Sequence, residues 1–153
     1  MQNRQRPFFA LIALALSALL AAPAIPAEGG VTVNVTVTDL RNTKGRIIAC
    51  MTSDERRFPR CRDVAGSYKA NAAASDSVVL HFAGVSPGTY AIALLHDENE
   101  NGRADRALTL IPREGFGFSR DAAVRMGPPD FEDAAFAVGS APINQTIRMR
   151  YLL

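Results

Sequence analysis

The amino-acid sequence predicts an all-β fold, a β-sandwich of about seven strands. Apolar residues recur at every second position in several segments, which is the period of a half-buried strand. A helical period of 3.6 residues is hardly found after the first 27 residues. Glycine and proline residues separate the alternating segments, as in sandwiches built from short strands.

The first half of the chain supplies two clear strands and one short one. Valines at alternate positions of 31–37, interleaved with Thr and Asn, predict a strand with one buried face. The segment 45–52 predicts a second strand, which contains Cys50. Between Asp54 and Ser75 the alternation is lost. We expect a charged loop there, followed by a short strand at 67–70.

The middle of the chain predicts a hairpin. Apolar residues alternate over 78–82 and again over 90–94. The intervening segment 84–88, Gly-Val-Ser-Pro-Gly, has the composition of a tight turn. We therefore expect these two strands to pair with each other.

Three more segments complete the predicted strands. Leu108–Ile111 and Ala134–Val138 are short apolar runs. Over 146–151, apolar residues alternate with Thr and Arg, which predicts the last strand.

The first 27 residues have the pattern of a cleaved signal peptide. Arg4 and Arg6 precede an apolar run over 8–22, which is short for a membrane span and typical of a signal-peptide core. Small residues follow at two sites, and we expect cleavage after Ala27. The alternative is an uncleaved membrane anchor. We expect a periplasmic or secreted protein with no transmembrane segment after cleavage.

Cleavage would leave 126 of the 153 residues, 28–153, as one domain large enough to bury a core. Two of the 17 basic residues lie in the leader, so 15 bases remain against 15 acids. A chain with no formal net charge lacks the basic face by which nucleic-acid-binding proteins release counterions. We therefore expect no nucleic-acid partner. The arginines between 56 and 62 are interleaved with acids, as in a solvated loop.

The two cysteines, Cys50 and Cys61, predict one disulfide, since an even count in an exported protein indicates pairing. A loop of this size contributes on the order of 2–3 kcal/mol. A redox pair would need closer spacing or a helix N-terminus that stabilises the thiolate. Metal binding by two lone thiols is the weaker alternative.

The segment from residue 97 to residue 105 has the spacing of a calcium-binding loop. Oxygen-bearing side chains occupy positions 1, 3, 5 and 9 of an EF-hand-type loop, with Gly102 at position 6 and a backbone carbonyl at position 7. The predicted ligands are Asp97, Asn99, Asn101, Asp105 and the carbonyl of Arg103. Hard oxygen ligands without thiols or imidazoles favour calcium over zinc or copper.

The strongest ligand of such a loop is missing. Position 12, where an EF-hand has a bidentate Glu, is Leu108. We expect weak binding at most, unless Glu114 or another carboxylate folds back. The alternative is an Asx-rich turn that binds no metal, in which Gly102 supplies the positive φ.

The two histidines differ in predicted position. His81 falls on the strand face opposite the apolar residues, so we expect it to face solvent or a loop. His96 is in register with the buried residues of 90–94 and should lie on the inward face beside Asp97. A hydrogen-bonded structural histidine is commoner than a catalytic base at such a position, and no nucleophile partner is visible.

The segment Ile111–Ser119 alternates glycine with phenylalanine. We expect its backbone to lie close against another part of the chain, with two rings as anchors. The functional alternative is a binding rim next to the acidic loop. The residues of this rim are Arg113, Glu114, Phe116 and Phe118.

Four segments carry a family resemblance. Residues 82–90 (FAGVSPGTY) look like the turn of prealbumin-like and carboxypeptidase-regulatory-like sandwiches. Residues 96–102, 111–119 and 128–134, in that order, resemble the secreted bacterial proteins grouped as domain of unknown function family 2141. The resemblance covers most of residues 31–153. It implies a secreted Ig-like or prealbumin-like β-sandwich, and it implies no particular activity.

Three hypotheses for the function follow. We favour an exported, non-catalytic binding or interaction module of the cell envelope, with an unknown protein or glycan as partner and a weak calcium loop. The second is a purely structural envelope protein. The third is a small hydrolase that uses His96 with Asp97, Glu98 or Glu114 as acid and base. We expect no enzyme, because the sequence has no zinc spacing, P-loop, dinucleotide fingerprint or nucleophile elbow.

Overall fold

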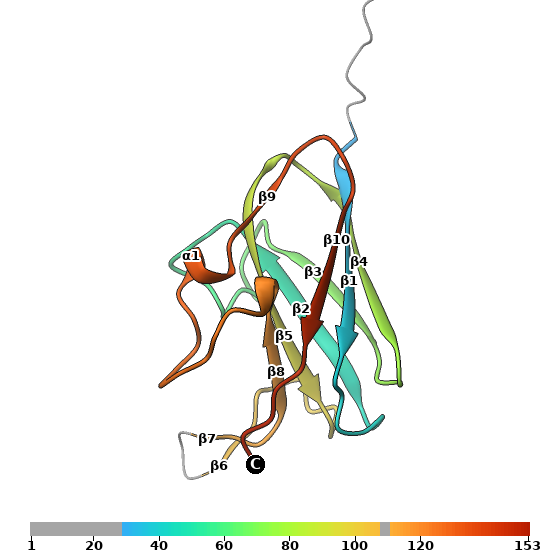
Figure 1. Ribbon diagram of the computed structural model, residues 1–153, viewed down its shortest axis with the longest axis vertical. Helices are drawn as coiled ribbons and strands as arrows, with labels where there is room; N and C mark the ends of the chain where they lie inside the picture. The colour runs from blue at the N-terminus through green and yellow to red at the C-terminus, as the bar shows by residue number, and fades with distance from the viewer. Residues whose placement is uncertain (1–28, 108–110) are drawn as a thin grey trace, which may run out of the picture.

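The computed structural model describes residues 29–107 and 111–153, and it confirms the all-β sandwich (Figure 1). A three-stranded sheet has the order β10-β1-β4, formed by β1 (Val31–Thr38), β4 (Val78–Val85) and β10 (Ile143–Arg148). The second sheet has the order β3-β2-β5-β8, formed by β3 (Tyr68–Ala73), β2 (Arg46–Thr52), β5 (Gly88–Asp97) and β8 (Gly115–Phe118). The predicted signal peptide lies outside the described residues.

Three short strands complete the architecture. β9 (Phe136–Val138) pairs with the start of β5. β6 (Arg106–Ala107) and β7 (Ile111–Pro112) form a separate two-stranded ribbon. The predicted strand over 108–111 therefore lies mostly outside the described residues, and Ile111 begins β7.

The core lies between the two sheets and follows the period-two pattern. Val33, Val35 and Val37 of β1 are fully buried and face Ile47 and Ile92 of the opposite sheet within one apolar cluster. Burying a side chain of this kind contributes about 1.5–3 kcal/mol relative to leaving it exposed. The alternation in the sequence thus decides which face of each strand is buried.

A second apolar cluster covers the outer face of the larger sheet. It contains Phe118 of β8 and Phe131 of the helix α1 (Phe131–Ala134). Phe58, from the loop between β2 and β3, packs edge-on against both rings, with centroids 5.8 and 6.0 Å away. The loop and the helix are therefore held on the sheet by aromatic contacts.

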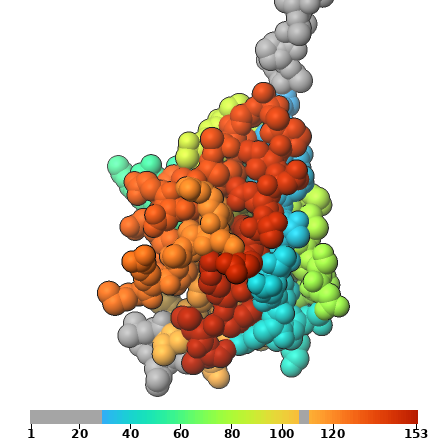
Figure 2. All heavy atoms as spheres, viewed as in Figure 1, coloured from blue at the N-terminus to red at the C-terminus, as the bar shows by residue number. Residues whose placement is uncertain are grey.

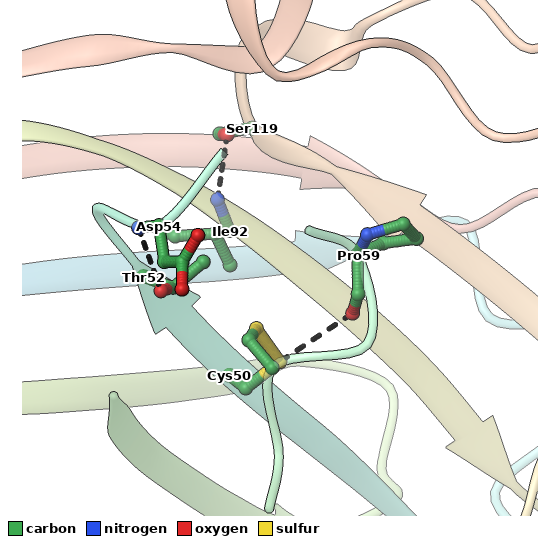
Figure 3. Close-up of a disulfide and its surroundings, with 7 residues drawn as sticks. Cys50, Thr52, Asp54, Pro59, Ile92 and Ser119 are labelled. Carbon is green, nitrogen blue, oxygen red and sulfur yellow. Dashed lines mark hydrogen bonds between the residues drawn. A yellow bond between two sulfur atoms is a disulfide. The ribbon is translucent and has the colours of Figure 1, made fainter. Parts of the chain in front are cut away.

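The structure confirms the predicted disulfide between Cys50 and Cys61 (Figure 3). Cys50 lies in β2 and Cys61 in the following loop, and both are buried. The amide of Asp54 donates to the Thr52 hydroxyl at 3.0 Å, which fixes the start of the same loop. The disulfide therefore holds the loop that carries Phe58 against the sheet.

The predicted hairpin over 78–94 is wrong. β4 pairs with β1, whereas β5 pairs with β2 and β8, so the turn at 86–87 crosses from one sheet to the other. Tyr68 of β3 holds this turn, because its hydroxyl accepts a hydrogen bond from the Ser86 amide at 3.2 Å. The apolar faces of the two strands meet across the core and not side by side in one sheet.

The C-terminal third differs from the prediction in three places. Residues 131–134 form the helix α1, so only 136–138 of the predicted strand 134–138 is extended. Residues 115–118, in which Gly and Phe alternate, form strand β8, which was not among the predicted strands. The last strand covers 143–148 and is parallel to β1.

The chain beyond β10 joins the two sheets on one side. Arg150 and Phe116 exchange both of their backbone hydrogen bonds, at 2.8 and 3.0 Å, so the C-terminal segment pairs with β8. In Figure 2 the red C-terminal residues lie against the blue-green segment that follows β1.

Among the residues that the structure describes, no helix is long and apolar enough to cross a membrane.

Candidate functional site

The residues of the predicted calcium loop, with Arg113 and Glu114 of the predicted rim, lie at the end of the sandwich where β5 ends. The loop 97–105 joins β5 to β6, as expected. Around it lie the segment 41–44 after β1, Glu114 between β7 and β8, and the C-terminal residues. A hollow of about 240 Å³ opens at this end, and it is lined by Arg41, Glu98, Asn99, Asp105, Arg113 and Glu114.

Asp97 anchors the base of the loop. Its side chain is fully buried, and its two carboxylate oxygens accept hydrogen bonds from the amides of Asn101 (3.1 Å) and Gly102 (2.8 Å). Gly102 has a φ of +74°, the left-handed conformation that was expected of it. The loop therefore wraps around the Asp97 carboxylate.

Two of the other predicted ligands, Asn99 and Asn101, converge on Asp105. The side-chain amides of Asn99 (2.8 Å) and Asn101 (3.0 Å) both donate to its carboxylate. The Asn99 and Asn101 side-chain oxygens accept from the amides of Asn101 and Arg103, at 3.1 and 2.7 Å. The structure thus brings the side chains at positions 3, 5 and 9 together, and these Asx turns connect them.

Glu114 folds back onto this loop. The side chain is only 5% exposed, and its Oε2 accepts a hydrogen bond from the Asp105 amide at 3.0 Å. Its Oε1 is buried and has no hydrogen-bond partner. Burial raises the pKa of Glu114, and the negative charges of Asp97 and Asp105 raise it further.

Arg41 closes the opposite side of the hollow. Its guanidinium forms an ion pair with Glu98 and donates to the Arg113 carbonyl at 2.9 Å and to the Leu153 carbonyl. The hydrogen bond from Arg41 lowers the pKa of Glu98, and the side-chain amide of Asn42 donates to the same carboxylate. The guanidinium also lies 4.6 Å from the centre of the Tyr151 ring.

His96 lies on the inward face, as predicted, and is fully buried. Its Nε2 is 2.7 Å from the Lys44 carbonyl oxygen, which can only accept, so Nε2 carries the proton. Its Nδ1 is 2.7 Å from the Tyr151 hydroxyl. His96 thus links the C-terminal segment to the loop after β1. His81, by contrast, is exposed and lies 2.8 Å from the Asn34 side chain.

The residues of the predicted rim lie in different environments. Arg113 is exposed and lines the hollow, while Phe116 is half-buried. Phe118 is buried in the aromatic cluster with Phe58, where a ligand would not reach it. Phe118 therefore anchors this segment by packing and does not form part of a binding rim.

The expected close approach of the glycine backbone is confirmed. A Cβ at Gly115 would lie 2.3 Å from the Tyr151 ring, and one at Gly117 would lie 2.9 Å from Ile147. Strand β8 therefore needs both glycines to reach the C-terminal segment.

The carboxylates do not form a ready-made cage. Within residues 29–107 and 111–153, no three His, Cys, Asp or Glu side chains are grouped closely enough to hold a metal ion. A cation at the loop would therefore have to replace the Asn amide groups that now face Asp105.

A family described as an uncharacterized protein conserved in bacteria, DUF2141, matches residues 35–146. The chain belongs to this family. No curated protein and no solved structure matches it. The region shared with DUF2141 includes the acidic loop and Glu114, whereas Tyr151 lies beyond it.

Sequence reasoning missed Arg41, Asn42 and Tyr151. Each reaches the site from far along the chain: Arg41 is 57 residues from Glu98, and Tyr151 is 55 residues from His96. No local pattern marks them, because an isolated Arg or Tyr in a loop has no characteristic spacing.

A second hollow, of about 480 Å³, lies between residues 120 and 133. Its polar lining includes Arg120, Arg125, Asp130 and Asp133, and Met126 beside them is fully exposed. Asp121, also in its lining, accepts a hydrogen bond from Arg148 of β10 at 2.7 Å. This hollow was not anticipated from the sequence.

Proposed function

We propose that this chain is an exported, non-catalytic β-sandwich module of the bacterial cell envelope whose acidic loop binds calcium with low affinity. One observation carries the proposal: the side chains of Asn99, Asn101 and Asp105 converge above the buried Asp97 carboxylate. Oxygen-bearing residues at alternate positions of a Gly-containing loop are how proteins surround calcium. Affinities of extracellular calcium modules, about 10⁻⁴ to 10⁻³ M, are the expected range.

Export is supported by the disulfide and by the leader pattern of the first 27 residues. A buried structural disulfide persists in an oxidising compartment and is rare in the cytosol. We propose an unidentified protein or glycan as the partner, bound at the rim formed by the exposed Arg113 and the half-buried Phe116, next to the calcium loop.

The position of His96 supports a non-catalytic role. In the hydrolase hypothesis this side chain would act as the general base. It is fully buried, and both ring nitrogens are engaged by Tyr151 and Lys44. A general base must reach the proton that it removes, directly or through one water. His96 would reach a substrate only if this end of the sandwich opened.

A second candidate is a structural domain whose loop binds nothing. It is favoured by the hydrogen bonds within the loop, because the side-chain amides of Asn99 and Asn101 already donate hydrogen bonds to the Asp105 carboxylate. An Asx-rich turn of this kind is stable without a metal.

Calcium titration of the mature protein separates the two candidates. Calorimetry should give a dissociation constant of about 10⁻⁴ to 10⁻³ M. At a calcium level about 100-fold above that constant, the free energy of unfolding should rise by about 2.7 kcal/mol. Asp105→Ala should abolish both effects, whereas Asp76→Ala, at an exposed aspartate in another loop, should change neither.

A melting curve that millimolar calcium leaves unchanged would favour the structural candidate. Equal shifts by magnesium and calcium would also argue against a dedicated calcium loop, because magnesium requires a tighter octahedral site.

A further inference from the structure

We infer that Asn101 is a modification site: the neighbouring Gly102 nitrogen converts its side-chain amide into a carboxylate when the loop 97–105 opens, and the closed loop suppresses this deamidation. The observation that carries the inference is a set of hydrogen bonds that holds both reacting groups. The inference does not depend on calcium binding.

The sequence selects the residue. In deamidation, the backbone nitrogen of the residue after an asparagine attacks the carbon of the side-chain amide. A glycine leaves this approach unhindered, because it has no side chain. Asn101-Gly102 is the only Asn-Gly pair in the chain, and the other asparagines after residue 27 precede Val, Thr, Ala, Glu or Gln. Asn101 is therefore the asparagine that should react fastest.

The reaction requires only base and water. The Gly102 nitrogen gives its proton to a base in the solvent and forms a bond to Cγ of Asn101. The bond between Cγ and Nδ2 breaks, and ammonia leaves. Water then opens the cyclic imide to aspartate or isoaspartate, so that one amide and one water become one carboxylate and one ammonium ion. No atom is oxidised or reduced.

The closed loop holds the attacking nitrogen in its protonated form. The Gly102 amide donates to Asp97 Oδ2 at 2.8 Å, and the Asp97 side chain is fully buried. Removing the amide proton would place a second negative charge beside this buried carboxylate, which is electrostatically unfavourable. The hydrogen bond to Asp97 therefore opposes the first step of the reaction.

The closed loop also holds the amide that is attacked. Nδ2 of Asn101 donates to both carboxylate oxygens of Asp105 at 3.0 Å, and Oδ1 accepts from the Arg103 amide at 2.7 Å. These hydrogen bonds fix the plane of the amide group. Attack on Cγ requires the nitrogen to approach from one face of that plane, so the side chain has to leave these partners. Deamidation therefore waits for local opening of the loop.

The product would change the loop. A carboxylate at position 101 has no hydrogen to donate, so both hydrogen bonds to Asp105 would be lost. Two negative charges would then face each other where an amide now meets a carboxylate. Deamidation of Asn101 is therefore a one-way chemical step that favours the open loop.

The test is prolonged incubation of the mature protein at neutral pH with a chelator, followed by peptide mapping by mass spectrometry. In protein unfolded by guanidinium chloride, Asn101 should deamidate faster than Asn71, which precedes an alanine. In the folded protein Asn101 should react at least about tenfold more slowly than in the unfolded chain, a ratio that corresponds to about 1.4 kcal/mol of opening free energy. Equal rates at Asn101 in the folded and unfolded protein, or a rate no higher than that of Asn71 in the unfolded chain, would overturn the inference.

Asp105→Asn tests the contacts themselves. It keeps the size of the side chain and removes the charge that holds the Asn101 amide, so Asn101 in the folded variant should react at least about fivefold faster than in the wild type. Asp76→Asn is the matched control, because Asp76 is exposed in another loop, and it should leave the rate unchanged. A wild-type rate in folded Asp105→Asn would show that these hydrogen bonds do not protect Asn101. The comparison of folded and unfolded wild type decides the inference if Asp105→Asn does not fold.

Discussion

At Gly115 the backbone of β8 lies against the Tyr151 ring, and the hydroxyl of that ring reaches His96 at 2.7 Å. Arg41 stacks on the same ring and pairs with Glu98. Each of these residues depends on the position of the next one. Small changes in side-chain size or charge here should therefore be measurable in the stability of the whole domain.

Gly115→Ala should destabilise the domain by about 1–3 kcal/mol, the usual cost of inserting a methyl group into a packed site. The new Cβ would lie 2.3 Å from the Tyr151 ring, which would have to move away from His96. Gly127→Ala is the control, because nothing lies within 4 Å of its Cβ position. Urea denaturation of both variants measures the difference, and equal stabilities would contradict this account of β8.

Glu98→Gln should lower the free energy of unfolding by about 1 kcal/mol at pH 7, because it removes a charged hydrogen-bond acceptor of Arg41 and Asn42. The hydrogen bond from Arg41 lowers the pKa of Glu98 below its usual value of 4.5. The contribution is therefore complete above pH 4.5 and is lost as the pH falls through the lowered pKa.

Urea denaturation of wild type and Glu98→Gln at pH 7 and pH 3 checks this prediction. The difference between the two proteins should shrink at pH 3, because this pH lies below the usual glutamate pKa of 4.5, where the contribution begins to be lost. A difference of the same size at both pH values would show that the ionised form of Glu98 contributes nothing.

At the scale of elements, the loop between β2 and β3 is the clearest case of a segment held by a few contacts. It has no regular strand pairing of its own, but the disulfide and the ring of Phe58 attach it to the larger sheet. The helix α1 is attached to the same sheet through Ser119, whose hydroxyl donates to the Ala134 carbonyl at 2.6 Å. The Ser119 hydroxyl also accepts from the Ile92 amide at 2.9 Å (Figure 3).

Replacing both cysteines, Cys50→Ala with Cys61→Ala, should lower the free energy of unfolding by about 2–3 kcal/mol. The two cysteines are 11 residues apart, and without the disulfide that closes this loop the unfolded chain has a higher conformational entropy. The folded sheets should remain, since the main core does not include the loop. Urea denaturation against the oxidised wild type measures the change, and the reduced wild type should match the variant. If the oxidised protein reacts with thiol reagents after denaturation, its cysteines are free and this prediction is wrong.

The local sequence pattern predicts where the strands lie better than it predicts which strands pair. Alternation of apolar residues correctly located the strands at 31–38, 46–52 and 78–85. The same alternation cannot say whether β4 pairs with β5 or faces it across the core, because both arrangements bury the same side chains. The helix α1 was missed because four residues are too few to show a helical period.

At the scale of the whole molecule, the chain beyond β10 closes one side of the sandwich. The Met149 amide still donates to the Thr38 carbonyl of β1, and the next residue, Arg150, pairs with Phe116 of β8 in the larger sheet. The acidic loop, the segment after β1 and the C-terminal residues meet at that end.

The exported protein should begin near Glu28 and carry the disulfide. The expectation rests on the basic residues and apolar run of the leader, followed by two cysteines. Intact mass of the protein recovered from the periplasm or medium should show residues 1–27 missing and two hydrogens lost. Retention of the leader in the membrane fraction would contradict the cleaved signal peptide.

Local spacing within about ten residues is enough to predict the all-β class, the buried face of each main strand, the disulfide and the oxygen-rich loop. Three-dimensional packing sets which strands pair, buries Phe118 and brings Arg41 and Tyr151 to the site. It also brings Glu114 to the Asp105 amide. These features depend on contacts between segments that are far apart in the sequence. The local pattern of each segment does not specify which other segment it will contact.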